Sequence, residues 1–243
     1  MTYGRLYLTP VAPTVKVHRG RRPRGSLSRE QVVETALALA DADGLDALTM
    51  PSLASRLGCG VMTIYGYVEN KEDLLDAIAQ RGLADLRLRR PLPTEPTAVL
   101  VSWGRALRFT LIEHPSLAVI FLSQAVIGPG IFRGIEALLG ALARSGMPPT
   151  AAVHAIYAVV TYATGFVAWE LPRTRRQSGS VYAAAWRREF ASLRPEDFPM
   201  TARVLDELQL VAGEEQFEVG LLALAHGLAR KHSGYTAKRG STT

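Results

Sequence analysis

A short uncharged stretch carries the residues whose chemistry is clearest. From Val61 to Val68 the chain reads VMTIYGYV and holds no charged side chain. Helical spacing places Ile64 and Val68 on an inner face and leaves a polar and aromatic outer face. That outer face consists of Met62, Thr63, Tyr65, Gly66 and Tyr67. Hydroxyl groups can bond to phosphates and apolar groups can contact thymine methyls, so this face predicts contact with a DNA groove.

Sequence signals on both sides of this stretch predict the helices that position it. Thr49 can cap a short first helix, and Pro51 is tolerated in the first turn of that helix. The glycines of residues 58–60 then break the helix. Asn70 predicts the cap of a further helix that begins at Lys71. A helix, a glycine-bearing turn and a second helix form the helix-turn-helix pattern, whose second helix enters the major groove.

Two longer helices are expected to complete this DNA-reading unit. Ser28 and Gln31 have the spacing of a capping box, so the first helix is expected to run from there to about Asp43. The last helix is expected from Lys71 to about Arg89. The alternative interpretation of the whole unit is a helical hairpin packed within a larger core. The uncharged outer face favours DNA binding over that alternative.

Positive charge is concentrated at the start of the chain. Residues 1–25 hold six basic side chains and no acidic one, whereas residues 26–82 hold four basic and nine acidic side chains, a net charge of −5. Glycine and proline interrupt residues 1–25, so we expect a disordered basic arm there. Arg19, Arg21, Arg22 and Arg24 are expected to contact phosphates or to enter an AT-rich minor groove. A tail that only aids solubility is the alternative.

The run from Ser26 to Ile78 closely resembles the N-terminal domain of the tetracycline-repressor (TetR) family. It contains the L-T-x-x-x-L-A-x-x-L-G stretch that starts at Leu48, the T-x-Y that starts at Thr63 and the N-K-x-x-L-L that starts at Asn70. The resemblance implies that Thr63, Tyr65, Tyr67 and Lys71 meet DNA. Gly66 departs from the family, which carries a larger side chain there. The expected DNA-binding residues are Arg19, Arg21, Arg22, Arg24, Thr49, Met62, Thr63, Tyr65, Gly66, Tyr67 and Lys71.

The rest of the chain predicts a larger helical domain, so the expected fold class is all-α. Three prolines in residues 90–96 mark a boundary between a DNA-binding domain at 26–89 and a body at 97–231, with a flexible tail at 232–243. Expected body helices are 97–113, 116–126, 130–145, 149–171, 180–193, 200–211 and 214–231. No apolar run reaches the length of a membrane span, and no secretory signal is recognised. A single cysteine suits a reducing cytoplasm, which is the expected location.

Aromatic and polar residues of the body could line a cavity for a small molecule. The expected ligand-binding residues are Trp103, Phe109, Phe121, His154, Tyr157, Thr161, Tyr162, Phe166 and Trp169. Plain core packing is the alternative for the aromatic residues. Cys59 suits a small apolar position in its turn as well as a redox sensor. No metal-ligand spacing, nucleophile elbow or glycine-rich phosphate loop is found, so we expect no metal, no cofactor and no enzymatic activity.

Two of the expected body helices have surfaces that could form an interface between two subunits. Residues 150–171 carry a stripe of small side chains, and residues 214–231 carry an apolar seam that starts at Phe217. The resemblance assigns both helices to a four-helix interface between two subunits, whereas intrachain packing is the alternative. We therefore expect a homodimeric transcriptional regulator, a repressor, that binds a palindromic operator and is released by a small apolar effector. The alternative is an architectural DNA-binding protein without a ligand.

Overall fold

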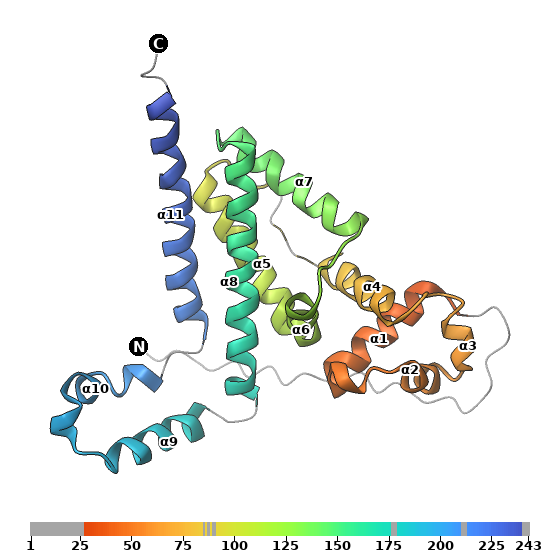
Figure 1. Ribbon diagram of the computed structural model, residues 1–243, viewed down its shortest axis with the longest axis horizontal. Helices are drawn as coiled ribbons and strands as arrows, with labels where there is room; N and C mark the ends of the chain where they lie inside the picture. Colours follow the sequence, from red (N-terminus) through yellow and green to blue (C-terminus); the bar gives the residue numbers. More distant parts are fainter. Residues whose placement is uncertain are drawn as a thin grey trace.

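The structure is a computed structural model that describes residues 27–84, 86, 88, 91–175, 179–209 and 213–239. Within those ranges every regular element is a helix, which confirms the expected all-α fold. The helices form a small head, α1 to α4, and a longer body, α5 to α11 (Figure 1). The predicted basic arm with its four arginines lies outside the described residues.

The head contains four α-helices in the expected order. They are α1 (Arg29–Asp43), α2 (Met50–Leu57), α3 (Val61–Ile64) and α4 (Lys71–Ala84), with a 3-10 turn η1 (Leu45–Ala47) between the first two. The predicted capping box of Ser28 with Gln31 is present, and Thr49 caps α2 by accepting from Ser52 N at 3.2 Å. Helix α4 was expected to reach about residue 89 but ends at Ala84.

Apolar side chains from all four helices pack together in the head, and this packing is continuous with the core of the body. Residues that are at most 1% exposed there include Val32, Ala36, Leu53, Ile64, Leu74 and Ile78. The αL conformation of Gly58, with φ 68°, lets the chain reverse between α2 and α3. This turn fixes the angle at which α3 projects from the head.

Seven α-helices form the body within the described residues. They are α5 (Pro96–Glu113), α6 (Pro115–Ser123), α7 (Pro129–Arg144), α8 (Pro149–Arg175), α9 (Gly179–Ala191), α10 (Pro199–Arg203) and α11 (Glu214–Arg239). Prolines in the first turn of α5, α6, α7 and α10 explain why those boundaries could be read from sequence. The expected helix at 200–211 is wrong. The chain leaves α10 at Val204, with φ −122°, and only a 3-10 turn η3 (Glu207–Gln209) follows.

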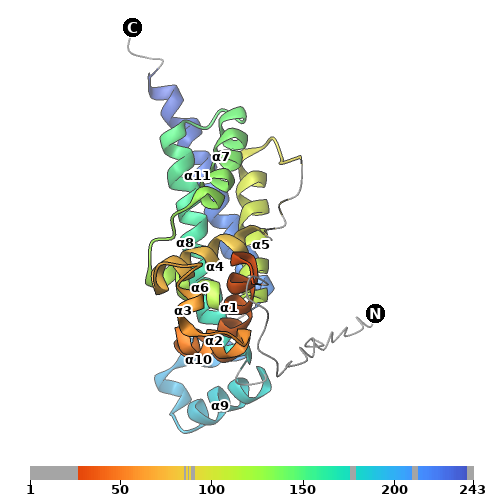
Figure 2. The ribbon, with the colours of Figure 1, turned by 90° about the vertical axis from the view of Figure 1, so that its right-hand side faces the viewer.

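Helices α5, α8 and α11 run together as the centre of the body (Figure 1). Gly104 of α5 allows Leu221 of α11 and Val159 of α8 to approach its backbone. Gly220 of α11 likewise faces the ring of Tyr162 on α8. Helix α11 was expected to end near residue 231 but continues to Arg239. Figure 2, viewed from the side of the head, shows these long helices behind the head and extending above it, with α9 at the lower end of the molecule.

Helix α8 contains a long apolar stretch. Its stretch Pro149–Leu171 is long and apolar enough to cross a membrane, although no run of that length was expected from the sequence. In the structure this stretch packs against α5, α6, α7 and α11, and 44% of it is buried. The position of α8 in the body accounts for the apolar side chains of its buried face.

Candidate nucleic-acid interface and effector site

The outer face of α3 and the turn after it form an exposed surface at the end of the head. Met62 is 81% exposed and Tyr65 is 46% exposed, while Thr63 and Gly66 are also exposed. Ile64 is fully buried, so the predicted division of this stretch into an inner and an outer face is correct there. The residues that remain outside offer hydroxyl, aromatic and thioether groups to a partner.

The hydroxyl groups of two expected DNA-contact residues form hydrogen bonds within the head. Tyr67 is half-buried, and its hydroxyl donates to the carbonyl oxygen of Leu27 at 2.7 Å. The expectation that Tyr67 lies free on the outer face is therefore wrong. The hydroxyl of Thr49 is committed to the cap of α2, although Thr49 itself is exposed. Lys71, at the first turn of α4, is exposed.

Helix α6 connects the head to the body at both of its ends. At its start, Asp41 of α1 accepts hydrogen bonds from Ser116 and lies 2.8 Å from His114 Nδ1. At its end, Gln124 donates to Asp76 of α4 at 2.9 Å. Between these bonds, Leu117 of α6 packs directly against Gly82 of α4, where no side chain would fit without a shift. A displacement of α6 would thus be transmitted to both α1 and α4.

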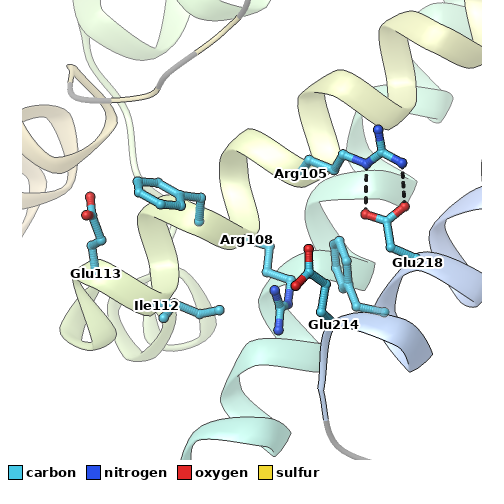
Figure 3. A pocket seen from close by; sticks show the side chains of 8 residues that line it. Arg105, Arg108, Ile112, Glu113, Glu214 and Glu218 are labelled. Carbon is cyan, nitrogen blue, oxygen red and sulfur yellow. Dashed lines mark hydrogen bonds and ion pairs between the residues drawn. The ribbon is translucent and has the colours of Figure 1, made fainter. Parts of the chain in front are cut away.

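A cleft of about 540 Å³ opens between α5 and the start of α11 (Figure 3). Its lining residues are Arg105, Arg108, Phe109, Ile112, Glu113, Glu214, Phe217 and Glu218. Arg105 donates two hydrogen bonds to the Glu218 carboxylate, at 2.8 and 2.7 Å, and these bonds raise the pKa of Arg105. The cleft therefore combines an apolar floor with fixed charges. Of the expected ligand-binding residues, Phe109 lines it.

A buried ion pair lies beside this cleft. Arg108 donates to Glu170 of α8 at 2.8 Å, and their side chains are only 15% and 7% exposed. The Arg108 guanidinium also lies 5.1 Å from the centre of the Phe217 ring. The expected residues Tyr162, Phe166 and Trp169 are brought together with this ring. Because Tyr162 donates to the carbonyl of Phe217 at 2.9 Å and burial raises its pKa, its hydroxyl stays protonated.

Several buried polar atoms of the body lack a hydrogen-bond partner. Among the described residues these include Trp103 Nε1 and Thr110 Oγ1 on α5 and Thr164 Oγ1 on α8. Trp103 was expected at the ligand site, whereas the two threonines were not. An unpartnered buried hydroxyl costs free energy unless another molecule bonds to it. The indole N–H of Trp103 can thus still donate a hydrogen bond, and the two threonine hydroxyls can still donate or accept one.

The structure separates the remaining expected ligand residues from these groups. His154, Tyr157 and Thr161 are exposed on the outer face of α8, with Tyr157 60% exposed. Phe121 on α6 is half-buried against the core. These three residues share one face of α8 as their spacing predicts, but spacing alone does not show which face of the helix points outward. Thus the structure corrects the expectation that these three residues line a cavity.

Sequence reasoning also missed the polar residues that join the parts of the molecule. Asp41, Arg108 and Glu170 were not singled out. A usable signal existed for Glu170, because a carboxylate inside the apolar run of α8 needs a cationic partner if it is buried. Within the described residues, no group of three or more His, Cys, Asp and Glu side chains could hold a metal ion.

Comparison with known families gives two matches. The family described as "Bacterial regulatory proteins, tetR family" matches residues 32–78, which contain α2, α3 and most of α1 and α4. The family described as "Tetracyclin repressor-like, C-terminal domain" matches residues 92–232, which contain the body. The second match alone extends over more than half of the chain.

Individual relatives agree with these matches. The chain is 31% identical over 182 residues to the HTH-type transcriptional repressor DrrR1 of Streptomyces coeruleorubidus, of whose length it spans 65%. It is 28% identical over 211 residues to the HTH-type transcriptional repressor Rv1353c of Mycobacterium tuberculosis, covering 84% of this chain and 80% of that relative.

Solved structures are similar over most of the chain. ActR of Streptomyces coelicolor in complex with actinorhodin superimposes with a TM-score of 0.76 at 27% identity, covering 86% of this chain and 98% of that one. A TetR variant of Acinetobacter baumannii in complex with minocycline gives a TM-score of 0.66 at 25% identity, covering 89% and 97%. In both of these structures a small molecule is bound.

Proposed function

Since the chain belongs to the tetR family of bacterial regulatory proteins, we propose that it is a ligand-responsive repressor of transcription. The observation that carries this proposal is the exposed face of Met62, Thr63 and Tyr65, held on a head in which α1 and α2 are capped and Ile64 anchors α3 in the core. Such a face fits the major groove of an operator. We place the protein in the cytoplasm, where it meets DNA.

The proposal includes a homodimer, because one helix-turn-helix reads only half of a palindromic operator. Exposed apolar and small residues on the outer faces of α8 and α11 support this; they are Val153, Tyr157, Gly165, Val219, Leu222, Ala223 and Gly227. Gly165 and Gly227 have open space around them although they interrupt long helices. A glycine costs helix stability, and close approach of a partner helix at these positions would offset that cost.

An effector would act through α6. A molecule bonded to Thr110 and Thr164 would lie between α5 and α8, and α6 continues directly from α5 at His114. Since Asp41 and Asp76 hold the two ends of α6, movement of this helix would tilt the head. A ligand that binds one orientation of the heads better than the other shifts the protein toward that orientation. We propose that the bound orientation places the two heads at a spacing that no longer fits the operator.

The basic arm completes the proposed DNA interface. The folded part of the head is acidic by count, so it would not attract DNA at long range. Arg19, Arg21, Arg22 and Arg24 supply the missing positive charge. Each neutralised phosphate should add about 0.9 to the slope of log affinity against log salt.

The cleft and the buried unpartnered hydroxyls distinguish this proposal from an architectural DNA-binding protein. A protein that only bends or coats DNA has no need of polar groups without partners in its core, whereas a ligand-responsive regulator uses them. The observed groups therefore favour the regulator.

The proposal can be tested with DNA that flanks the protein's own gene. We expect the native chain to bind one fragment at nanomolar concentration, and Tyr65→Ala to bind it at least tenfold more weakly. Actinorhodin and minocycline serve as first effector probes, because these compounds are bound in the similar structures. An effector should raise the melting temperature and release the DNA. Equal binding of all fragments, unchanged by Tyr65→Ala, would contradict the proposal.

A further inference from the structure

Both arginines that line the cleft between α5 and α11 are paired with carboxylates of other helices. Arg105 donates to Glu218 of α11 at 2.8 and 2.7 Å, and Arg108 donates to Glu170 of α8 at 2.8 Å. These bonds connect α5 to both neighbouring helices and hold the walls of the cleft in place. An anionic ligand would have to compete with a carboxylate for either arginine.

Two other carboxylates of the lining have no such partner. Among the described residues, none forms an ion pair with Glu113 or with Glu214. Both side chains are exposed. The bonds to Glu218 are the main cause of the raised pKa of Arg105, and the charge of Glu214 adds to it. The described lining thus holds three carboxylates against two guanidinium groups, so the cleft carries an excess of negative charge.

The position of Glu113 in its helix adds to this negative charge. Glu113 is the last residue of α5, and the last turn of α5 contains no basic residue. The unpaired carbonyl groups at the end of a helix carry partial negative charge, so a carboxylate there is unfavourable and a cation is favourable. A positive group near Glu113 would be attracted by the carboxylate and by the end of α5.

Apolar surface lies between the two free carboxylates. Phe109 is 41% exposed and Ile112 is half-buried, and in the view of Figure 3 Ile112 lies between Glu113 and Glu214. The volume of about 540 Å³ is that of a site for a drug-sized molecule. No group of three metal-binding side chains occurs in the part of the chain that the structure describes. These features fit an organic cation rather than a metal ion.

We propose that the cleft between α5 and α11 binds a flat amphipathic organic cation. Its rings lie against Phe109 and Ile112, where an aromatic face also favours positive charge, and its charge is balanced by Glu113 and Glu214. None of the residues proposed for the dimer face lines this cleft. As a statement about the effector, the inference rests on the proposed function, whereas the binding itself is measured without DNA.

The first test compares two dyes that share the xanthene ring system, measured by fluorescence anisotropy with the full chain. Rhodamine 6G is a cation and fluorescein is an anion. The whole chain has a formal net charge of +6, so long-range attraction would favour the anion. A preference for the cation would therefore come from the cleft. We expect rhodamine 6G to bind at least about tenfold more tightly at about 0.15 M salt.

The second test removes the charges of the cleft one at a time. Glu113→Gln and Glu214→Gln preserve the size of each side chain, and each should weaken rhodamine 6G binding about threefold. The double variant should weaken it about tenfold, because the two carboxylates act independently. Glu215→Gln is the matched control, since it removes the same charge from the next residue of α11, which does not line the cleft. It should leave the affinity unchanged.

Three results would overturn the inference. They are equal binding of the two dyes, no binding of rhodamine 6G, and an equal loss of affinity in Glu215→Gln and the two cleft variants. A chain that gives one of these results but binds its operator would leave the DNA-binding function standing. A chain that binds rhodamine 6G as expected but binds no DNA fragment would support the site and remove the proposed repressor function.

Discussion

Asp41 of the head caps helix α6 of the body at Ser116. One carboxylate oxygen accepts from Ser116 N at 3.1 Å and from Ser116 Oγ at 2.7 Å, while the other lies 2.8 Å from His114 Nδ1. The N-cap residue of α6, His114, provides no capping bond from its own side chain. A carboxylate on α1 thus satisfies the first turn of a helix in the other domain.

This cap predicts that Asp41→Asn uncouples the two domains. The amide has a single acceptor and presents a donor to the start of α6, so we expect a loss of about 1–2 kcal/mol in the free energy of unfolding. An effector should then release DNA less completely from the variant. Denaturant unfolding and operator titrations with and without effector measure the two effects. Asp43→Asn is the control, because its exposed pair with Arg56 should contribute less than about 1 kcal/mol.

Lys71→Ala should weaken operator binding without changing which operator is preferred. An exposed lysine at the start of α4 can neutralise a phosphate, so the salt slope should fall by about one for each subunit. Titrations over a range of salt concentrations, with several operator variants, provide the measurement. Arg144→Ala removes the same charge from an exposed position at the end of α7 and should leave the slope unchanged. A slope that is identical in all three chains would mean that Lys71 does not contact DNA.

Thr110→Val and Thr164→Val should stabilise the protein and impair its response. Each change removes a buried hydroxyl that lacks a partner, so the free energy of unfolding without effector should rise by about 1 kcal/mol. The effector should bind more weakly to the variants, because its hydrogen-bond partner is gone. Calorimetric binding and thermal unfolding separate these effects. Destabilisation by both changes would indicate that the hydroxyls are satisfied within the protein.

Gly220→Ala and Gly134→Ala should have opposite effects on stability. A methyl group at Gly220 would meet the Tyr162 hydroxyl and displace it from the Phe217 carbonyl, at a cost of about 1–3 kcal/mol. A methyl group at Gly134 of α7 meets open space and should stabilise that helix by about 0.5–1 kcal/mol. Denaturant unfolding at fixed protein concentration compares the two. If both substitutions changed the free energy of unfolding equally, the close approach of α8 and α11 at Gly220 would be contradicted.

Glu95 should make the stability of the body depend on pH. Burial alone would raise the pKa of its carboxyl, but bonds from the backbone N–H groups of Thr97 and Ala98 outweigh burial and lower the pKa. The ionised form is thus favoured in the folded state, so its stabilisation is present above the unfolded pKa and is lost as the pH falls through the folded one.

We therefore expect Glu95→Ala to cost about 1 kcal/mol at pH 7 through the lost cap of α5. The difference from the native chain should shrink as the pH falls below about 4. Unfolding curves between pH 7 and pH 3 measure this trend. Glu136→Ala removes an exposed carboxylate in the middle of α7 and serves as the control. A difference that stays constant with pH would argue against a role for the ionised cap.

Local signals made the head predictable from the sequence. Ser28, Thr49 and Asn70 act on backbone groups within three residues, so their caps do not depend on the rest of the fold. Tyr67 could not be placed in this way. The expected inner positions Ile64 and Val68 are both buried, but helix α3 ends at Ile64, and the turn that follows brings the Tyr67 hydroxyl to Leu27.

In the body, the exposure of individual residues depends on tertiary packing, which local sequence patterns do not predict. Tyr157 and Tyr162 both belong to an apolar helix, yet the first is exposed and the second stacks on Phe217, because only one side of α8 faces α11. The contacts of Asp41 and Glu170 join residues at least 62 positions apart, which no local pattern encodes. The end of α10 at Val204 likewise has no breaker in the sequence.

The order of the helices along the chain has a consequence for synthesis on the ribosome. The four helices of the head are complete once Ala84 has been made, whereas the packing of the body waits for Phe217, Leu221 and Ala225 of α11. Domains fold in the order in which they leave the ribosome. The nascent protein thus acquires its DNA-reading surface before it can sense an effector, and a product truncated before α11 would carry that surface without its regulatory half.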